Sequence, residues 1–154
     1  MTTFSKRILA ALLPASAFAL CIGMAAQASP VQDLPVDHPM RVNGVETACT
    51  GIGQREEHEG RWGSYPVKME AVQAHGEYLA DEDVTIRPGR GAEILRVHCA
   101  APWVLMRLEP GHYDATMRVP NSTSKEVAFT VPRRGQRDVI VRFPTRATGV
   151  MNQS

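Results

Sequence analysis

The twelve consecutive residues from Pro102 to Tyr113 carry the pattern of a strand, a tight turn and the start of another strand. Residues 103–108 alternate between two faces, Pro110-Gly111 interrupts the run, and alternation resumes over residues 113–119. We therefore predict an antiparallel pair of strands here. A Tyr just past such a corner can bury its ring while its hydroxyl bonds to nearby backbone, which holds corners in β-sandwiches.

The rest of the chain repeats this kind of signal, with short alternating segments separated by turns that contain Gly or Pro. The expected strands are residues 45–49, 67–71, 84–86, 95–99, 104–108, 113–119, 127–131 and 139–143. Seven or eight short strands at near-regular spacing, with almost no helical pattern, predict an all-β fold of the sandwich type. Trp103 is expected in its core.

The first 28 residues have the three parts of a secretory signal peptide. Lys6 and Arg7 precede an apolar run, and Ala26-Gln27-Ala28 is a small-x-small cleavage site. Pro14 interrupts the apolar run, which argues against a membrane span. We therefore expect a periplasmic or secreted protein that does not span the membrane after cleavage. Its predicted parts are a signal peptide (1–28), an extended leader (29–42), one β-sandwich domain (43–146) and a flexible tail (147–154).

The charge of the mature chain is nearly balanced but unevenly distributed. The whole chain has 17 Lys and Arg against 16 Asp and Glu, and removal of Lys6 and Arg7 leaves 15 against 16. Residues 29–86 hold 4 basic and 11 acidic side chains, whereas residues 87–154 hold 11 basic and 5 acidic ones. A basic half can bind polyanions, and the plainer alternative is that the two halves interleave in one sandwich.

Several turn and core motifs resemble those of small secreted bacterial proteins described as carboxypeptidase regulatory-like domain proteins. The matching residues are Gly76-x-Tyr78-Leu79-Ala80-Asp81-x-x-Val84-x-Ile86, the Pro88 to Gly91 turn, Pro102-Trp103 through Pro110-Gly111-x-Tyr113, and Gly51-Ile52-Gly53. The resemblance covers roughly residues 49–143 and implies a Greek-key sandwich of the transthyretin (prealbumin) type.

This resemblance transfers no catalytic residue. In metallocarboxypeptidases the related domain sits beside the catalytic domain and carries no zinc ligands. Two features of this chain depart from the family pattern. The segment between Gly53 and Tyr65 is short and polar where relatives carry a longer helix, and Cys49 and Cys99 are not part of the general pattern.

Cys49 and Cys99 are the two cysteines that remain after cleavage, and both lie on apolar faces of expected strands. In an oxidising compartment such a pair favours a disulfide, and the alternative is two buried free thiols. For metals, the candidates are His38 with Met40, the run from Glu56 to Glu59, and Asp81 to Asp83, none of which has a recognised ligand spacing. We expect no metal and no cofactor.

Catalytic motifs are missing from the sequence: there is no Gly-x-Ser-x-Gly elbow, no His-Glu-x-x-His helix and no Gly-rich phosphate loop after a strand. We therefore predict that the protein is not an enzyme. The candidate ligand-binding residues are Trp62 and Tyr65, which are expected to be exposed, Asp81 and Asp83 in an acidic loop, and Arg133, Arg134 and Arg137 on a basic hairpin. The hairpin could hold a phosphate or a lipopolysaccharide head group, but no interleaved aromatic residues point to nucleic acid.

From these observations we predict a non-catalytic periplasmic binding or interaction module of the bacterial envelope, with an unknown ligand and a monomeric or weakly associating state. The alternative is a structural or accessory subunit that stabilises an envelope protein by strand addition at a sheet edge.

Overall fold

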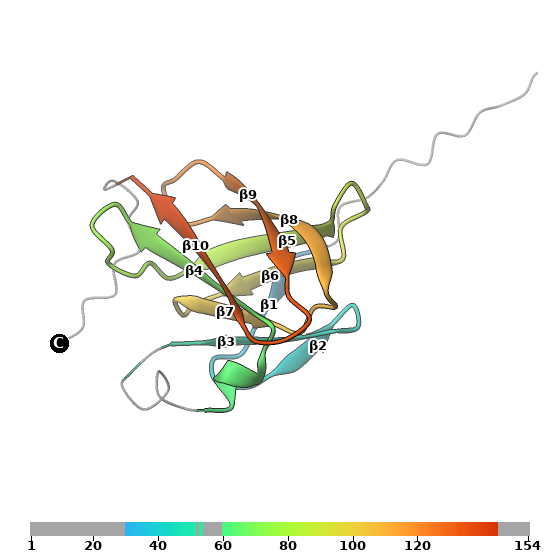
Figure 1. Cartoon of the computed structure of the whole chain (residues 1–154). Coiled ribbons are helices and arrows are strands. Elements are labelled where there is room, and N and C mark those ends of the chain that lie inside the picture. Colours follow the sequence, from blue (N-terminus) through green and yellow to red (C-terminus); the bar gives the residue numbers. More distant parts are fainter. Residues whose placement is uncertain (1–29, 52, 54–59, 145–154) are drawn as a thin grey trace, which may run out of the picture.

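The structure is a computed structural model that describes residues 30–51, 53 and 60–144, which form a sandwich of two five-stranded sheets (Figure 1). The expected signal peptide and the whole of the expected tail lie outside these residues. Sheet A contains, in spatial order, β1 (Gln32–Asp33), β6 (Leu95–Cys99), β5 (Glu82–Pro88), β8 (Gly111–Arg118) and β9 (Lys125–Val131). Sheet B contains β10 (Arg137–Phe143), β4 (Val67–Gln73), β7 (Trp103–Met106), β3 (Val45–Thr50) and β2 (Met40–Val42).

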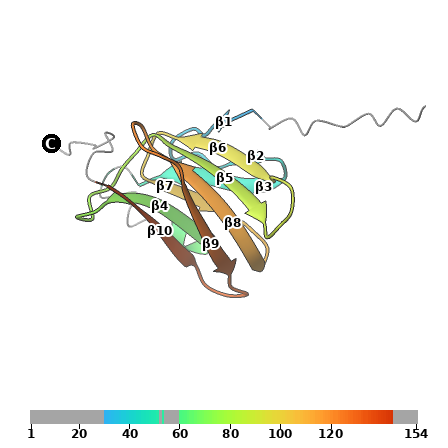
Figure 2. The ribbon, with the colours of Figure 1, turned by 90° about the horizontal axis from the view of Figure 1, so that it is seen from above.

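The predicted all-β sandwich is confirmed, and each of the eight expected strands has a counterpart. One short 3-10 helix, η1 (Trp62–Ser64), precedes β4. Among the described residues, no helix has the length and apolar character needed to cross a membrane. The strands β9 and β10 lie along one side of the sandwich, and β1 and β2 lie toward the other (Figure 2).

The structure differs from the sequence prediction in the segment expected to be a leader. Residues 32–42 contribute two strands to the sandwich, because β1 pairs in parallel with β6 and β2 pairs in antiparallel fashion with β3. Between them Leu34 is buried, and its backbone N–H donates to the carbonyl of His98 at 2.9 Å. Strands of two and three residues are too short to produce a periodic signal, so the sequence does not reveal them.

The predicted antiparallel pairing of residues 103–108 with 113–119 is wrong. β7 lies in sheet B between β3 and β4, whereas β8 lies in sheet A between β5 and β9. The corner around Pro110 therefore carries the chain from one sheet to the other, with Leu108 buried between them. Because of this crossing β8 lies beside β5 rather than β6, which is the long-connection arrangement of a Greek key.

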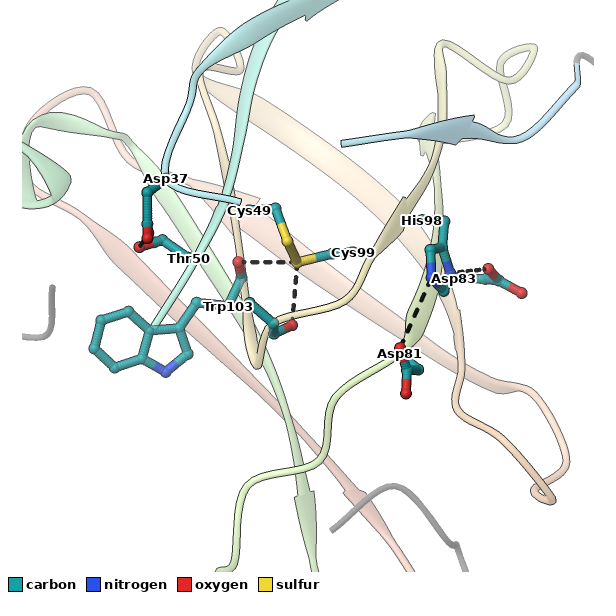
Figure 3. The surroundings of a disulfide bond; sticks show 9 residues. Asp37, Cys49, Thr50, Asp81, Asp83, His98, Cys99 and Trp103 are labelled. Atoms are coloured by element: carbon teal, nitrogen blue, oxygen red, sulfur yellow. Dashed lines mark hydrogen bonds and ion pairs between the residues drawn. A yellow bond between two sulfur atoms is a disulfide. The ribbon is translucent and has the colours of Figure 1, made fainter. Parts of the chain in front are cut away.

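The core lies between the sheets, and the disulfide crosses it. Cys49 on β3 and Cys99 on β6 are bonded, with a Cα–Cα separation of 5.4 Å and both residues fully buried (Figure 3). The predicted disulfide is therefore confirmed, and it joins sheet B to sheet A. Around it pack the inward-facing apolar side chains, the largest of which are Phe143, Met69, Leu79, Ile86, Leu95, Met106 and Met117.

Trp103 is buried as expected, but its indole packs away from the disulfide, on the outer side of sheet B (Figure 3). Tyr78 meets it edge-on at 6.2 Å between ring centroids, and the Lys68 Nζ lies 4.6 Å from its ring. Gly51 has a φ of +99°, and a Cβ at this position would lie 2.7 Å from the Trp103 ring. This close approach explains why a glycine directly follows β3.

Candidate functional site

The basic hairpin predicted from the sequence is not a hairpin, because β9 belongs to sheet A and β10 to sheet B. The chain crosses between the sheets over residues 132–136, and we call this connection together with Arg137, the first residue of β10, the arginine turn (residues 132–137). Gly135 takes a φ of +81°, a left-handed conformation that glycine adopts without strain. Arg133, Arg134 and Arg137 are all exposed. Within the described residues, none of the three forms an ion pair with a carboxylate. The turn therefore presents three uncompensated guanidinium groups to solvent.

The arginine turn is held in place by a neighbouring segment that is far away in the sequence. The side-chain amide of Gln136 donates to the backbone carbonyls of Trp62 at 2.8 Å and Tyr65 at 3.0 Å. The backbone N–H of Arg137 donates to the carbonyl of Pro66 at 2.7 Å. The turn thus lies beside η1 (Figure 1), and the structure brings together two groups of candidate residues that the sequence treats separately.

The expectation that Trp62 is exposed is wrong. Trp62 and Tyr65 are only 4% and 3% exposed, and they form a second apolar cluster with Ala48 and Leu105 on the outer face of sheet B. The segment from 60 to 65 covers this face because Ala48 and Leu105 leave an apolar surface there. Neither ring is available to stack on a sugar or a peptide in this arrangement. Their part in the site is to support the arginine turn.

Polar contacts connect this second apolar cluster to β3 and to the residue that follows β7. The Tyr65 hydroxyl donates to the Glu46 carboxylate at 3.1 Å, and the Arg107 Nε donates to the same carboxylate at 3.3 Å. The hydrogen bond from Tyr65, together with Arg107, lowers the pKa of Glu46. Burial, with Glu46 alongside, raises the pKa of Tyr65. A second cation, the guanidinium of Arg61, lies 4.1 Å from the centroid of the Trp62 ring. Positively charged groups therefore lie at the border of the cluster.

Asp81 and Asp83 do not join this site. The expectation that both lie in a loop is wrong for Asp83, which is on β5 in the opposite sheet, while Asp81 directly precedes that strand. Asp83 on β5 accepts a hydrogen bond from Arg118 on β8, and its Oδ1 lies 2.9 Å from the His98 Nδ1 on β6. Asp81 is more distant, with its Oδ1 4.0 Å from the His98 Nε2 (Figure 3). Burial opposes ionisation of Asp83, but the bonds to His98 and Arg118 outweigh it and lower the pKa.

These contacts follow from sheet register, since Asp83 lies directly opposite His98 on one side and Arg118 on the other. The network therefore links three neighbouring strands of sheet A.

Beside this network lies a shallow pocket of about 230 Å³, lined by Val31, Asp83, Thr85, Arg96, Thr116, Arg118 and Ser124. A second pocket of about 370 Å³ between β5, β8 and β9 contains none of the predicted residues.

The metal candidates are not brought together among the residues that the structure describes. No group of three or more His, Cys, Asp or Glu side chains in these residues has a metal-binding arrangement. His38 is exposed on the segment between β1 and β2. The run from Glu56 to Glu59 lies outside the described residues.

One chemically unusual residue escapes the sequence analysis. Glu82 begins β5 opposite Cys99 and is fully buried, and in the described part of the chain no side chain hydrogen-bonds to its carboxylate. Burial raises the pKa of Glu82 well above its ordinary value against the opposing effect of the Ala71 backbone, and the nearby charge of Glu70 adds to the increase. The sequence shows it only as the middle of an acidic triplet, which is typical of a solvated loop.

Comparisons with known proteins give little further information. No family model matches the chain, and no curated protein matches it. A solved structure, the Klebsiella pneumoniae 5-hydroxyisourate hydrolase, is similar with a TM-score of 0.39 and 12% sequence identity. The match covers 51% of this chain and 83% of that one.

Proposed function

We propose that this protein is a non-catalytic binding module of the bacterial envelope that contacts an anionic envelope component through the arginine turn. The observation that carries the proposal is the set of three exposed guanidinium groups, Arg133, Arg134 and Arg137, on a turn whose position is held by Gln136. A phosphate-bearing ligand, such as a lipopolysaccharide head group, has the matching charge.

The chemistry of arginine supports this choice of ligand. A planar guanidinium donates two parallel hydrogen bonds to a phosphate or carboxylate, and it stays charged at any physiological pH. A turn that is already ordered loses less conformational entropy when it binds than a free loop does. The two hydrogen bonds from Gln136 and the one from the Arg137 backbone give the turn this order.

The proposed location rests on two features of different kinds. Residues 1–28 have the pattern of a signal peptide, and the Cys49–Cys99 disulfide is compatible with an oxidising compartment. The membership of the carboxypeptidase regulatory-like family, suggested by the turn motifs, remains part of this proposal. The family's accessory domain in metallocarboxypeptidases is consistent with a role without catalysis.

Binding to immobilised heparin and to lipopolysaccharide tests the proposal. We expect the triple variant Arg133→Gln, Arg134→Gln, Arg137→Gln to elute at lower salt than the unchanged protein. The matched control is Arg87→Gln, Arg90→Gln, Arg96→Gln, which makes the same charge change on β5, β6 and their connection and should elute near the unchanged protein. An equal loss in both variants, or no retention of the unchanged protein, would contradict the proposal.

The variant Gln136→Ala examines the order of the turn separately from its charge. It keeps all three arginines and removes the two bonds to the carbonyls of Trp62 and Tyr65. We expect weaker retention with an unchanged number of positive charges. Retention identical to that of the unchanged protein would mean that charge alone determines binding.

The second candidate function is that of an accessory subunit that adds a strand to an envelope protein. It is favoured by the long outer edges of β9 and β10, each of seven residues, which no strand among the described residues pairs with. Affinity purification of the tagged protein from its own periplasm distinguishes the two. An accessory subunit should bring down one protein in constant ratio, whereas a binding module should retain an envelope molecule that the arginine variants lose.

A further inference from the structure

The outer edge of sheet B has an unusual composition for an unpaired edge. β10 pairs with β4 on one side over all seven residues, and no described residue forms a strand on its other side. The continuous register contains no bulge, and residues 137–143 contain neither Pro nor Gly. In its middle Ile140 is 49% exposed. A regular edge of this kind offers unpaired N–H and C=O groups to another strand.

The backbone geometry identifies which groups the free edge presents. In a parallel pair, the N–H and C=O of one residue point to the same side of the strand, and successive residues alternate sides. The Arg137 N–H donates toward β4, to the carbonyl of Pro66. The odd-numbered residues of β10 therefore bond to β4. Asp138, Ile140 and Arg142 turn their N–H and C=O groups to the free edge, and their side chains are exposed.

These three residues form a self-complementary pattern. Asp138 and Arg142 lie two positions before and after Ile140, so an antiparallel pairing centred on Ile140 matches the edge with itself. In this register Ile140 lies opposite the partner's Ile140, and Asp138 lies opposite the partner's Arg142. All three outward-facing residues of each chain then exchange backbone hydrogen bonds, and shifting the centre away from Ile140 leaves at least one of them unpaired.

We propose that the chain forms a two-fold symmetric dimer by antiparallel pairing of β10 with a second copy, centred on Ile140. The interface is isologous, as in most homodimers, and joins the two copies of sheet B into one continuous sheet. An apolar pair lies on the symmetry axis, and two ion pairs flank it. Opposite charges directly across an antiparallel ladder stabilise the pairing, whereas like charges destabilise it.

The neighbouring side chains leave room for these contacts. Asp138 contacts Lys68 of its own chain at 3.5 Å and its side chain is still 54% exposed, so it has space for a second cation. Arg142 forms no ion pair within the part of the chain that the structure describes. The other long edge, β9, exposes Glu126, Ala128 and Thr130, which have no such complementarity when they are paired with themselves.

The dimer is compatible with the proposed ligand site without depending on it. The arginine turn ends at Arg137, the first residue of β10, so antiparallel pairing places the two turns at opposite ends of the shared strand pair. Arg133 and Arg134 then lie beyond the residues that pair with the partner's β10, and of the turn only Arg137 lies within the paired length.

Sedimentation velocity of the exported protein over a range of concentrations tests the proposal. We expect a concentration-dependent dimer. Arg142→Asp puts like charges opposite each other at both ends and should weaken dimerisation at least tenfold. The double variant Asp138→Arg, Arg142→Asp exchanges the charges and should restore the dimer. The matched control Arg134→Asp makes the same charge change on the arginine turn and should dimerise like the unchanged protein.

Amide hydrogen exchange gives a second measurement that locates the interface. In the dimer the amides of Asp138, Ile140 and Arg142 should exchange more slowly as the concentration rises, while amides already bonded to β4 should change little. A protein that is monomeric at every concentration overturns the proposal. So does a dimer that ignores Arg142→Asp, fails to recover in the double variant, or leaves the Ile140 amide unprotected.

Discussion

The hydroxyl of Tyr113 donates a 3.0 Å hydrogen bond to the backbone carbonyl of Glu109, across the corner where the chain passes from sheet B to sheet A. The Tyr113 ring is partly buried and stacks on Phe129 with centroids 5.8 Å apart. This is the corner bond that the sequence predicts. It holds the connection between β7 and β8, which are in different sheets, rather than a hairpin between paired strands.

Tyr113→Phe should lower the free energy of unfolding by about 1 kcal/mol, because it removes this hydrogen bond and keeps the ring. Urea denaturation measures the change. Tyr113→Leu serves as the comparison, since it also removes the stacking on Phe129 and should lose more. A Tyr113→Phe variant as stable as the unchanged protein would show that water replaces the bond to Glu109 at no cost.

Removal of the disulfide should cost far more. Cys49 and Cys99 are separated by 50 positions, and the loop-entropy relation gives about 4 kcal/mol for a closed loop of this length. The double variant Cys49→Ala, Cys99→Ala should therefore unfold at much lower urea concentration than the oxidised protein. The reduced unchanged protein should behave like the variant. Alkylation of both thiols in unreduced periplasmic protein would contradict the existence of the bond.

Trp62→Ala should destabilise the domain by roughly 3 kcal/mol, because it empties the centre of the second apolar cluster on the outer face of sheet B. Thermal unfolding followed by circular dichroism measures the loss. Trp62→Phe keeps an aromatic ring in the cluster and should lose less. If Trp62→Ala is as stable as the unchanged protein, then the cluster contributes little and the ring is free for another role.

Glu82 should make stability fall as the pH rises. Its pKa in the folded protein is well above the ordinary value of 4.5, so above pH 4.5 the unfolded chain releases a proton that the folded chain retains. The contribution of Glu82 is therefore fully present below pH 4.5 and is lost as the pH rises toward and through the folded-state pKa. Glu82→Gln cannot ionise and should lack this loss.

Urea denaturation at several pH values compares Glu82→Gln with the unchanged protein. The difference in stability should grow in favour of Glu82→Gln above pH 4.5. Glu126→Gln, at an exposed position of β9, is the control and should follow the pH dependence of the unchanged protein. Parallel curves for Glu82→Gln and the unchanged protein would show that Glu82 does not titrate abnormally.

One part of the candidate site could be predicted from the sequence and another part could not. Arg133, Arg134 and Arg137 are predicted on an exposed turn because a charged segment with Gly135 between two expected strands has a local signature. The burial of Trp62 has no local signature. It depends on Ala48 and Leu105, which lie on strands that are distant in the sequence and adjacent in sheet B. Gln136 reveals its role only once the carbonyls of Trp62 and Tyr65 are beside it.

The sequence by itself determined eight of the ten strands, the corner at Tyr113 and the two cysteines available for a bond, because alternation, turn residues and residue type act over a few neighbouring positions. Only the tertiary structure decided that β7 and β8 belong to different sheets, that β1 and β2 complete the sandwich, and that Glu82 is buried. Strand pairing and burial depend on contacts between distant segments. Hydrophobic burial is non-directional, so a local pattern specifies which face is buried but not which segment covers it.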